Sequence, residues 1–322
     1  MPGFKNAIYK IIRPLGGLKI ARYLSRNHPK ILMYHRFSES GGNGKLSVDT
    51  FRSQMEILSA YFHPMTMKGL IQAFYSGNMP DNAVVVTFDD GYYDFYEYAY
   101  PVLKEFDIPA TLFLTTGFIN KDLWLWPDKI RYAIAKANKA SFNLPGFPTC
   151  LNLDNKDDAW NEVADHCMKV SNKEKNQLIK CLYHELDVVE PKNAPKEFES
   201  LTWGQVKHLI ENGIEIGSHS YSHPIMTKLD EKELLEELSF SKEQIFDELG
   251  IEVDIFCYPN GQITDFDARV KDALLRAGYS YAVAAFPGRS PLSDLLAIKR
   301  YPVNSSISMY EKNVFGLSFL RF

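Results

Sequence analysis

Two adjacent aspartates that follow an apolar run are the residues of this chain best placed to do chemistry. The apolar run predicts a buried strand over residues 84–88, and Asp89, Asp90 and Gly91 follow this strand directly. Because side chains alternate along a strand and the chain turns at Gly91, the two carboxylates point in different directions. One can bind a metal while the other accepts a proton. In the alternative interpretation, Asp89 caps the next helix and Asp90 belongs to a turn.

Two histidines four residues apart form a second candidate group. His219 and His223 follow another apolar run, 214–217, so they also lie at the end of a predicted strand. Their spacing brings both imidazoles to one side of a helical turn or tight loop, which is typical of paired nitrogen ligands. Two histidines and one carboxylate leave coordination positions open for water and substrate, as hydrolytic zinc sites require.

A third apolar run ends in a tight turn at residues 256–261, which read Phe-Cys-Tyr-Pro-Asn-Gly. A Pro-Asn-Gly turn can aim a backbone N–H at a developing oxyanion. The same three residues are also those of an ordinary turn. This turn is the third loop at the C-terminal edge of the predicted strands, after those of the aspartates and the histidines, which favours a functional role.

These three motifs, in this order, resemble those of the polysaccharide deacetylases, the NodB-homology or carbohydrate esterase family 4 group. The family's Thr-Phe-Asp-Asp-Gly motif stands unchanged at 87–91, and its His-Ser/Thr-x-x-His-Pro motif stands at 219–224. The third motif, usually Arg-x-Pro-Tyr-Gly, reads Cys-Tyr-Pro-Asn-Gly at 257–261, so the arginine and the tyrosine are missing. The resemblance covers roughly residues 31–118 and 200–304.

The resemblance implies a metal-dependent N-deacetylase that removes acetyl from an N-acetylated sugar of a glycan or glycan precursor in cell-surface polysaccharide biosynthesis. It implies that Asp89 is the general base. It also implies that Asp90, His219 and His223 bind one divalent metal, most often Zn²⁺. The backbone N–H of Asn260 is implied to help form the oxyanion hole.

The general acid and the missing arginine need replacements. The family's last motif supplies a histidine near the C-terminus, but no histidine follows His223. The apolar run 31–34 delivers His35 to a strand end, which resembles the permuted branch typified by poly-N-acetylglucosamine deacetylases. An imidazolium suits protonation of a leaving amine near neutral pH, and the alternative for His35 is a structural role. Arg300, which ends the last predicted strand, is the candidate for the missing arginine, with a solvated surface position as its alternative.

Seven apolar runs predict the strands that position these residues, and helical patterns lie between them. The predicted strands are 31–35, 84–88, 111–115, 214–217, 254–258, 279–284 and 297–303, and the clearest helical patterns are 94–105, 202–212 and 230–249. Strands that alternate with helices indicate a parallel sheet. Since every candidate site residue lies at the C-terminal end of a strand, we expect an α/β fold, a distorted (β/α)7-type barrel with its site on that rim.

Residues 119–200 depart from this alternation. Several helical patterns there predict a mostly helical insertion within a barrel domain that covers residues 31–322. A stretch of this length needs structure of its own. Trp124 and Trp126 are candidates either for stacking on sugar rings or for anchoring the insertion in the core.

Residues 1–30 predict a basic amphipathic segment. They hold seven Lys or Arg and no Asp or Glu, interspersed with apolar residues. Such a segment suits peripheral contact with an anionic membrane, and the alternative is a helix that packs on the barrel with solvated lysines. The charges interrupt any apolar run of signal-peptide length. With four cysteines in no metal or disulfide spacing, we expect a cytoplasmic protein, at the inner membrane face if the segment binds lipid.

Composition limits the remaining functions. The 322 residues are 45% apolar and 24% charged, as in ordinary globular proteins, and the formal net charge of −4 argues against a nucleic-acid partner. Two other functions stay open. The missing motif residues also fit a catalytically silent, metal-containing carbohydrate-binding module, and the same chemistry fits an amidohydrolase that acts on a non-sugar amide.

Overall fold

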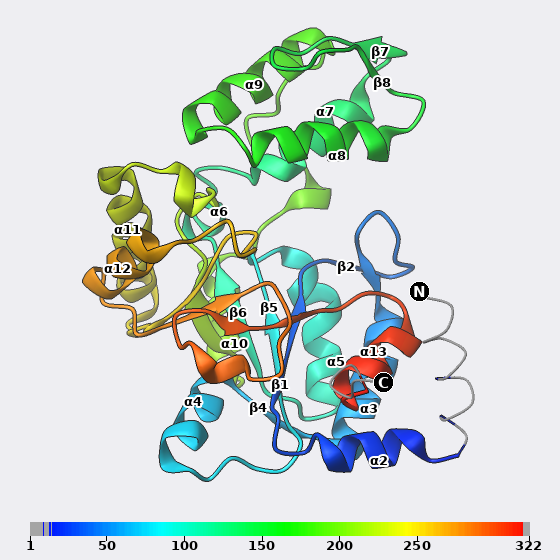
Figure 1. Cartoon of the computed structure of the whole chain (residues 1–322). Coiled ribbons are helices and arrows are strands. Elements are labelled where there is room, and N and C mark those ends of the chain that lie inside the picture. The colour runs from blue at the N-terminus through cyan, green and yellow to red at the C-terminus, as the bar shows by residue number, and fades with distance from the viewer. Residues whose placement is uncertain (1–8, 10–12, 14, 318–322) are drawn as a thin grey trace.

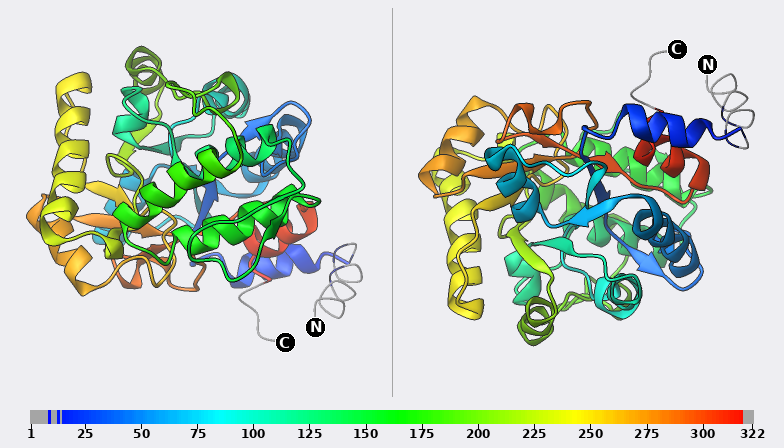
Figure 2. Two further views of the ribbon diagram at one scale, coloured as in Figure 1. Left: turned by 90° about the horizontal axis from the view of Figure 1, so that it is seen from above. Right: turned by 90° about the horizontal axis from the view of Figure 1, so that it is seen from below.

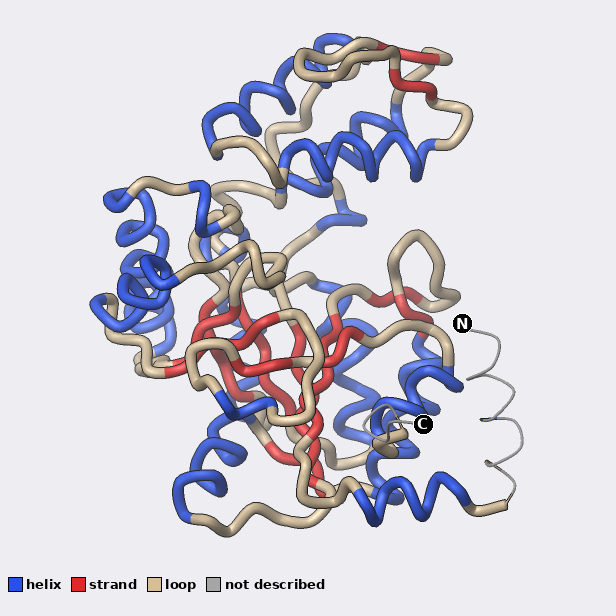
Figure 3. The backbone as a smooth tube through the Cα atoms, viewed as in Figure 1, coloured by secondary structure: helices blue, strands red, loops and turns tan. Residues whose placement is uncertain are grey.

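The computed structural model describes residues 9, 13 and 15–317, and a parallel sheet lies at its centre (Figure 1, Figure 3). The strands pair in the order β12-β11-β10-β9-β6-β5-β1-β13, with β4 on the side of β5. Their bounds are β1 Lys30–Tyr34, β4 His63–Met65, β5 Ala83–Phe88, β6 Ala110–Leu114, β9 Glu215–Ser218, β10 Ile255–Cys257, β11 Tyr281–Ala284, β12 Ile298–Lys299 and β13 Tyr301–Pro302.

The sheet curves into a nearly closed barrel because one segment pairs with both of its edges. Only Arg300 separates β12 from β13, and these two short strands pair in parallel with β11 and with β1. Counted as one strand, β12 and β13 occupy the last of the seven strand positions that the sequence predicts. The strand β5 is buried on both faces, as its run of valines leads us to expect for a central parallel strand. The predicted distorted barrel is confirmed.

Helices cover the outside of the barrel. Their bounds are α2 Gly17–Leu24, α3 Val48–Tyr61, α4 Met67–Ser76, α5 Tyr100–Glu105, α6 Thr116–Ile119, α10 Trp203–Glu211, α11 Glu231–Leu249, α12 Ala268–Arg276 and α13 Ile307–Val314. The helix α11 begins with a capping box between Asp230 and Glu233 and ends at Gly250, which has φ 67°. The predicted helix 94–105 instead begins with a π-helical turn at Phe95–Ala99 before α5.

The stretch between β6 and β9 contains a small subdomain that packs on itself. It holds α7 (Trp126–Lys136), a hairpin of β7 (Ser141–Phe142) and β8 (Leu151–Asn152), α8 (Lys156–Cys167) and α9 (Asn172–Glu185). Its buried apolar residues form a cluster separate from those of the barrel. These helices lie above the barrel in Figure 1 and in front of it when seen from above in Figure 2.

The N-terminal segment is described only in part. Of the predicted segment 1–30, residues 1–8, 10–12 and 14 lie outside the described residues. The helix α2 buries Leu18 and Ala21 and leads into β1. Among the described residues, no helix has both the length and the apolar character needed to cross a membrane.

Candidate active site

Strand alternation explains why the candidate residues meet inside one end of the barrel. Ile31, Val85 and Ile298 belong to one buried cluster, which also contains buried residues of α4 and is distinct from the larger cluster of the other helices. Side chains two or four positions further along each strand point the same way, so His35, Asp89 and Arg300 follow in the next layers. This layer lies at the C-terminal ends of the strands, the rim on which sites of such barrels lie.

Arg300 holds Asp89 with two hydrogen bonds. Its Nη1 lies 2.7 Å from Oδ1 of Asp89 and its Nη2 lies 2.8 Å from Oδ2, a bidentate pair. The guanidinium also donates to Thr87 Oγ1 at 3.0 Å and to the Ala284 carbonyl at 3.1 Å. The Arg300 side chain is completely buried, which excludes the solvated surface position.

The charge of Arg300 fixes the protonation state of Asp89. Burial alone would raise the pKa of Asp89, but the Arg300 guanidinium outweighs this effect and holds that pKa below its usual range. Asp89 is therefore ionised at neutral pH. Each of its oxygens still has a lone pair that can accept a further proton or hydrogen bond.

His35 approaches the same carboxylate from the open side. Its Nε2 lies 3.8 Å from Asp89 Oδ2, and its side chain is 45% exposed, whereas that of Asp89 is 3% exposed. This imidazole is therefore open to solvent while it lies beside the buried Asp89 carboxylate. Such a position suits proton delivery to a group bound above Asp89.

Asp90 turns away from Asp89 toward the two histidines. Its Oδ1 lies 3.3 Å from Nε2 of His219 and 3.4 Å from Nε2 of His223, and all three side chains are buried. The His219 Nδ1 lies 2.7 Å from the Cys257 carbonyl oxygen, which can only accept, so Nδ1 carries the proton. Burial lowers the pKa of His219, but Cys257, Asp90 and Asp89 outweigh this effect and hold that pKa well above its usual value. A divalent cation bound at Nε2 would therefore displace a proton from this nitrogen.

The donor set fits a divalent cation. Burial lowers the pKa of His223 to about 3, so this ring is neutral near pH 7. Asp90 Oδ1 and His223 Nδ1 have no hydrogen-bond partner within the described part of the chain. Buried lone pairs that face one another repel unless a cation lies between them. Metal–ligand distances of about 2.0–2.1 Å at tetrahedral angles separate ligand atoms by roughly 3.3–3.4 Å, the spacing found here.

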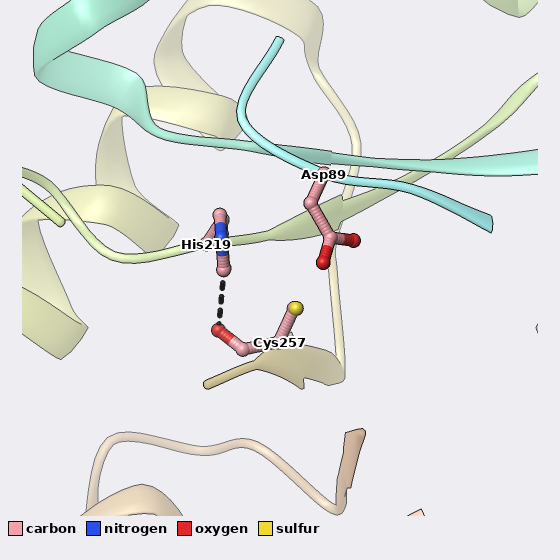
Figure 4. Close-up of side chains that lie close together, drawn as sticks. All are labelled: Asp89, His219 and Cys257. Carbon is pink, nitrogen blue, oxygen red and sulfur yellow. Dashed lines mark hydrogen bonds between the residues drawn. The ribbon is translucent and has the colours of Figure 1, made fainter. Parts of the chain in front are cut away.

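A second group of potential ligands shares His219. Figure 4 shows Asp89, His219 and Cys257 around a common space, with the hydrogen bond from His219 to the Cys257 carbonyl. Arg300 occupies both oxygens of Asp89, and its Nη2 lies 3.1 Å from Cys257 Sγ. Because this guanidinium repels a cation, Asp90, His219 and His223 are the better metal ligands.

Left-handed backbone conformations shape the loops at the rim. Asp90 has φ 78°, Ser220 has φ 67°, His223 has φ 58° and Asn260 has φ 54°. Such conformations cost L-residues on the order of 1–2 kcal/mol each, so the surrounding packing has to impose them. Strained residues of this kind gather at functional sites, and here three of the four are candidate site residues.

Glu237, on α11, holds the histidine loop in place. Its Oε2 accepts the backbone N–H groups of Tyr221 at 2.9 Å and Ser222 at 2.8 Å, between the two histidines. Glu237 was not among the site residues predicted from the sequence. A single glutamate in an acidic helix gives no signal that its carboxylate points into the protein.

Asn260 is at the rim but is not tied to the other site residues. The adjoining turn is closed by a hydrogen bond of 2.7 Å from Gly261 N to the Pro259 carbonyl. Within the described residues, the Asn260 backbone N–H has no acceptor and its buried Nδ2 has no partner. No hydrogen bond or ion pair there joins Asn260 to the six other candidate residues.

The predicted stacking role of Trp124 and Trp126 is not supported. The two side chains are 3% and 6% exposed, so neither offers a face to a sugar ring. Trp126 Nε1 instead donates to the His223 carbonyl at 3.2 Å. Both tryptophans anchor the subdomain, and Trp126 connects it directly to a candidate metal ligand.

Arg36 makes a second connection between the rim and the subdomain. Its guanidinium lies 3.7 Å from the centre of the Tyr92 ring, and its Nε lies 2.6 Å from Asp94. Tyr92 Oη donates to Asp128 of α7 at 2.5 Å. Burial raises the pKa of Asp128 to about 6, although Arg36 opposes this shift. The sequence analysis missed this cluster, whose members lie far apart in the chain.

The family model and the curated relatives that match this chain point to the same family. A family model described as polysaccharide deacetylase matches residues 76–141 and 155–282. A Staphylococcus aureus poly-β-1,6-N-acetyl-D-glucosamine N-deacetylase is 35% identical over 81 residues, which are 25% of this chain and 28% of that protein. A putative polysaccharide deacetylase, YxkH of Bacillus subtilis, is 37% identical over 86 residues, 26% of this chain and 30% of that one. The matched stretch thus spans less than a third of these relatives.

Solved structures show the same fold at low identity. IcaB from Ammonifex degensii superposes with a TM-score of 0.60 and 17% identity, over 90% of this chain and 97% of that one. The Streptococcus pyogenes deacetylase PplD in complex with acetate gives a TM-score of 0.59 and 18% identity, over 91% and 97%.

Proposed function

The chain belongs to the polysaccharide deacetylase family, and from this premise we propose that it is a metal-dependent N-deacetylase of an N-acetylated sugar. One observation carries the proposal. An ionised, arginine-held carboxylate, Asp89, stands directly beside three converging potential ligands, Asp90, His219 and His223. Of these, Asp90 Oδ1 and His223 Nδ1 have no hydrogen-bond partner in the described residues. A binding module would need neither the buried base nor an exposed imidazole next to it.

The residues of the chain divide the reaction between them. A divalent cation on Asp90, His219 and His223, in our proposal Zn²⁺, supplies a Lewis acid that polarises the acetyl carbonyl and makes water more acidic. Asp89 accepts a proton from water as the water oxygen attacks the amide carbon. His35 then donates a proton to the departing nitrogen, so that amide and water become free amine and acetate.

Two further groups support these proton transfers. Arg300 keeps Asp89 ionised and fixes the plane of its carboxylate, although it also makes Asp89 a weaker base. The backbone N–H of Asn260 has no acceptor among the residues that the structure describes, which suits hydrogen bonding to the oxyanion that develops on the acetyl oxygen.

We propose an N-acetylglucosamine-containing glycan, or its precursor, as the substrate, in the biosynthesis of a surface polysaccharide. The name of the S. aureus relative supports this class. We place the protein in the cytoplasm, which the four free cysteines favour. Fractionation of cells that produce the full chain checks this location, and recovery from the culture medium or the cell wall would contradict it.

The test of the activity is acetate release from a panel of N-acetylated sugars after chelation and restoration of zinc or cobalt. The panel includes nucleotide-linked, lipid-linked and oligomeric substrates, with Asp89→Asn as the control. We expect metal-dependent release that the control lacks. Bound metal without release from any sugar would contradict the proposal; release from non-sugar amides alone would then indicate an amidohydrolase, and no release at all a silent binding module.

A further inference from the structure

The helix α2 is apolar on both of its faces. Leu18 and Ala21 pack against the barrel. The opposite face carries Ile20, Tyr23 and Leu24, which are between 57% and 64% exposed. Leu15, just before the helix, is 77% exposed. A helix that only covers its own barrel has polar residues on its outer face, so this outer face requires another explanation.

The exposed apolar surface continues on a second helix at the same end of the barrel. Phe74 and Tyr75, near the end of α4, are 43% and 64% exposed. A groove of about 510 Å³ lies beside α4, lined by Phe74, by residues 27–29 after α2 and by residues 289–293. Figure 1 and the view from below in Figure 2 show both helices on this side. We call Leu15, Ile20, Tyr23, Leu24, Phe74 and Tyr75 the basal surface.

Basic residues border the basal surface. Lys19 and Arg289 are exposed, and Arg22 donates to the Tyr61 carbonyl without an acidic partner in the described residues. The chain holds no Asp or Glu before Glu39. Two acids near α2 are paired with further basic residues, whereas the exposed Asp254 lies on the α4 side, beside Tyr281, whose ring is close to that of Tyr75.

Asp81 lies 3.4 Å from Arg26, and Glu311 lies 2.9 Å from Arg13. On the α2 side, Lys19 and Arg22 therefore leave the border with uncompensated positive charge, and Arg289 adds a further cation at the groove. A surface with apolar and aromatic groups at its centre and cations at its border matches the interface of an anionic bilayer.

We propose that the basal surface docks the protein onto an anionic lipid bilayer. The charges favour this occupant over a second copy of the chain, since two copies in contact would bring their own basic borders together. Tyrosine and phenylalanine side chains suit the headgroup level of the bilayer, and the leucine and isoleucine side chains suit its acyl boundary.

Docking in this way fixes which end of the barrel faces the membrane. The helix α2 leads into the N-terminal end of β1, whereas Asp89 and His35 follow the C-terminal ends of β5 and β1. The basal surface and the candidate active site thus lie at opposite ends of the barrel. If the proposed deacetylase function holds, the enzyme works on sugars that stand away from the bilayer, in preference to a sugar attached directly to a membrane lipid.

Vesicle cosedimentation of the full chain tests the docking without any measurement of activity. The probes are vesicles of phosphatidylcholine alone and vesicles with added phosphatidylglycerol. We expect binding to the anionic vesicles, at least about tenfold weaker in an Ile20→Ser, Tyr23→Ser, Leu24→Ser variant. The matched control is Phe240→Ser with Phe246→Ser on α11, two half-exposed residues away from the basal surface, and it keeps full binding.

Charge reversal tests the contribution of the basic border to vesicle binding separately from that of the apolar centre. Lys19→Glu with Arg289→Glu is expected to remove the preference for phosphatidylglycerol and to leave the thermal unfolding temperature unchanged. Equal binding to neutral vesicles, or equal loss in the α11 control, would overturn the proposal. So would a dimer in analytical ultracentrifugation that the triple variant dissociates, because the surface would then bind a second copy.

Discussion

Asp89 and Asp90 are neighbours in the chain and equally buried, yet their surroundings differ. Both oxygens of Asp89 are held by Arg300, at 2.7 and 2.8 Å. Asp90 Oδ1 faces Nε2 of His219 and of His223 and has no hydrogen-bond partner within the described residues. We call Asp89, Arg300 and His35 the base half of the site, and Asp90 with its two histidines the metal half.

The difference shows how one strand end can supply two functions. The base half is complete within the protein, since an internal cation balances its carboxylate. The metal half has no internal cation of this kind, and its Asp90 Oδ1 and His223 Nδ1 are buried without a hydrogen-bond partner in the described residues, which fits the proposed external cation. Each half can be disturbed by substitutions that leave the other intact, and the following predictions rely on that independence.

The largest loss of turnover is expected from Asp89→Asn. An amide cannot accept the proton, and general base catalysis contributes up to about 10⁴-fold, so we expect a loss of about 10³-fold or more. Steady-state acetate release measures it. Near-normal turnover would show that another group is the base.

The next largest effect is expected from His35→Ala. This variant keeps the metal half and the Asp89–Arg300 pair, but it lacks the proton donor, so the rate falls by at least about a hundredfold. His35→Gln is the matched control of similar size, and we expect an equal loss. Rate measurements with metal content determined in parallel test this, and unchanged rates in both variants would assign the acid to another group.

Arg300→Gln is expected to move the pH dependence as well as the rate. The low pKa of Asp89 stabilises the fold above the pKa of the unfolded carboxyl, and this stability is lost as the pH falls through the folded pKa. Without the guanidinium, burial raises the pKa of Asp89, and the acid limb of kcat/KM shifts to higher pH. Loss of one partner from a buried pair also costs on the order of 3–5 kcal/mol of stability.

Arg300→Lys is the control for this prediction. It keeps the charge but not the bidentate geometry, so its acid limb is expected to lie between those of the wild type and Arg300→Gln. An acid limb that does not move in Arg300→Gln would mean that Asp89 is not the group that titrates.

A smaller effect, confined to the metal half, is expected from Glu237→Gln. Its amide keeps one acceptor for the loop N–H groups but loses the charge, and such supporting groups contribute about 10–100-fold to metal affinity. Zinc titration is expected to show weaker binding, and excess zinc is expected to restore turnover. Turnover that excess zinc does not restore would indicate that Glu237 supports more than the metal ligands.

The sequence identifies what local patterns determine. Valine-rich runs predict the strands, Asp230 and Gly250 mark both ends of α11, and two motifs locate the carboxylates and histidines. Arg300 is predicted only as the candidate to replace the arginine that is missing from the third motif.

Features that depend on long-range contacts escape sequence analysis. Closure of the barrel by the segment around Arg300, the Cys257 carbonyl that sets the His219 tautomer, and the Arg36 cluster each join residues far apart in the chain. The cap of α3 is a local example: Ser47, and not the neighbouring Asp49, accepts the Thr50 N–H. Local sequence cannot show which of several neighbouring polar residues turns inward.

The most direct test of the division between Asp89 and Asp90 is calorimetric zinc titration of the wild type, Asp89→Asn and Asp90→Asn. We expect one zinc ion per chain in the wild type and in Asp89→Asn, with similar affinity, and none bound tightly in Asp90→Asn. Loss of zinc from Asp89→Asn, with retention in Asp90→Asn, would place the metal on Asp89, His219 and Cys257 and would contradict the account.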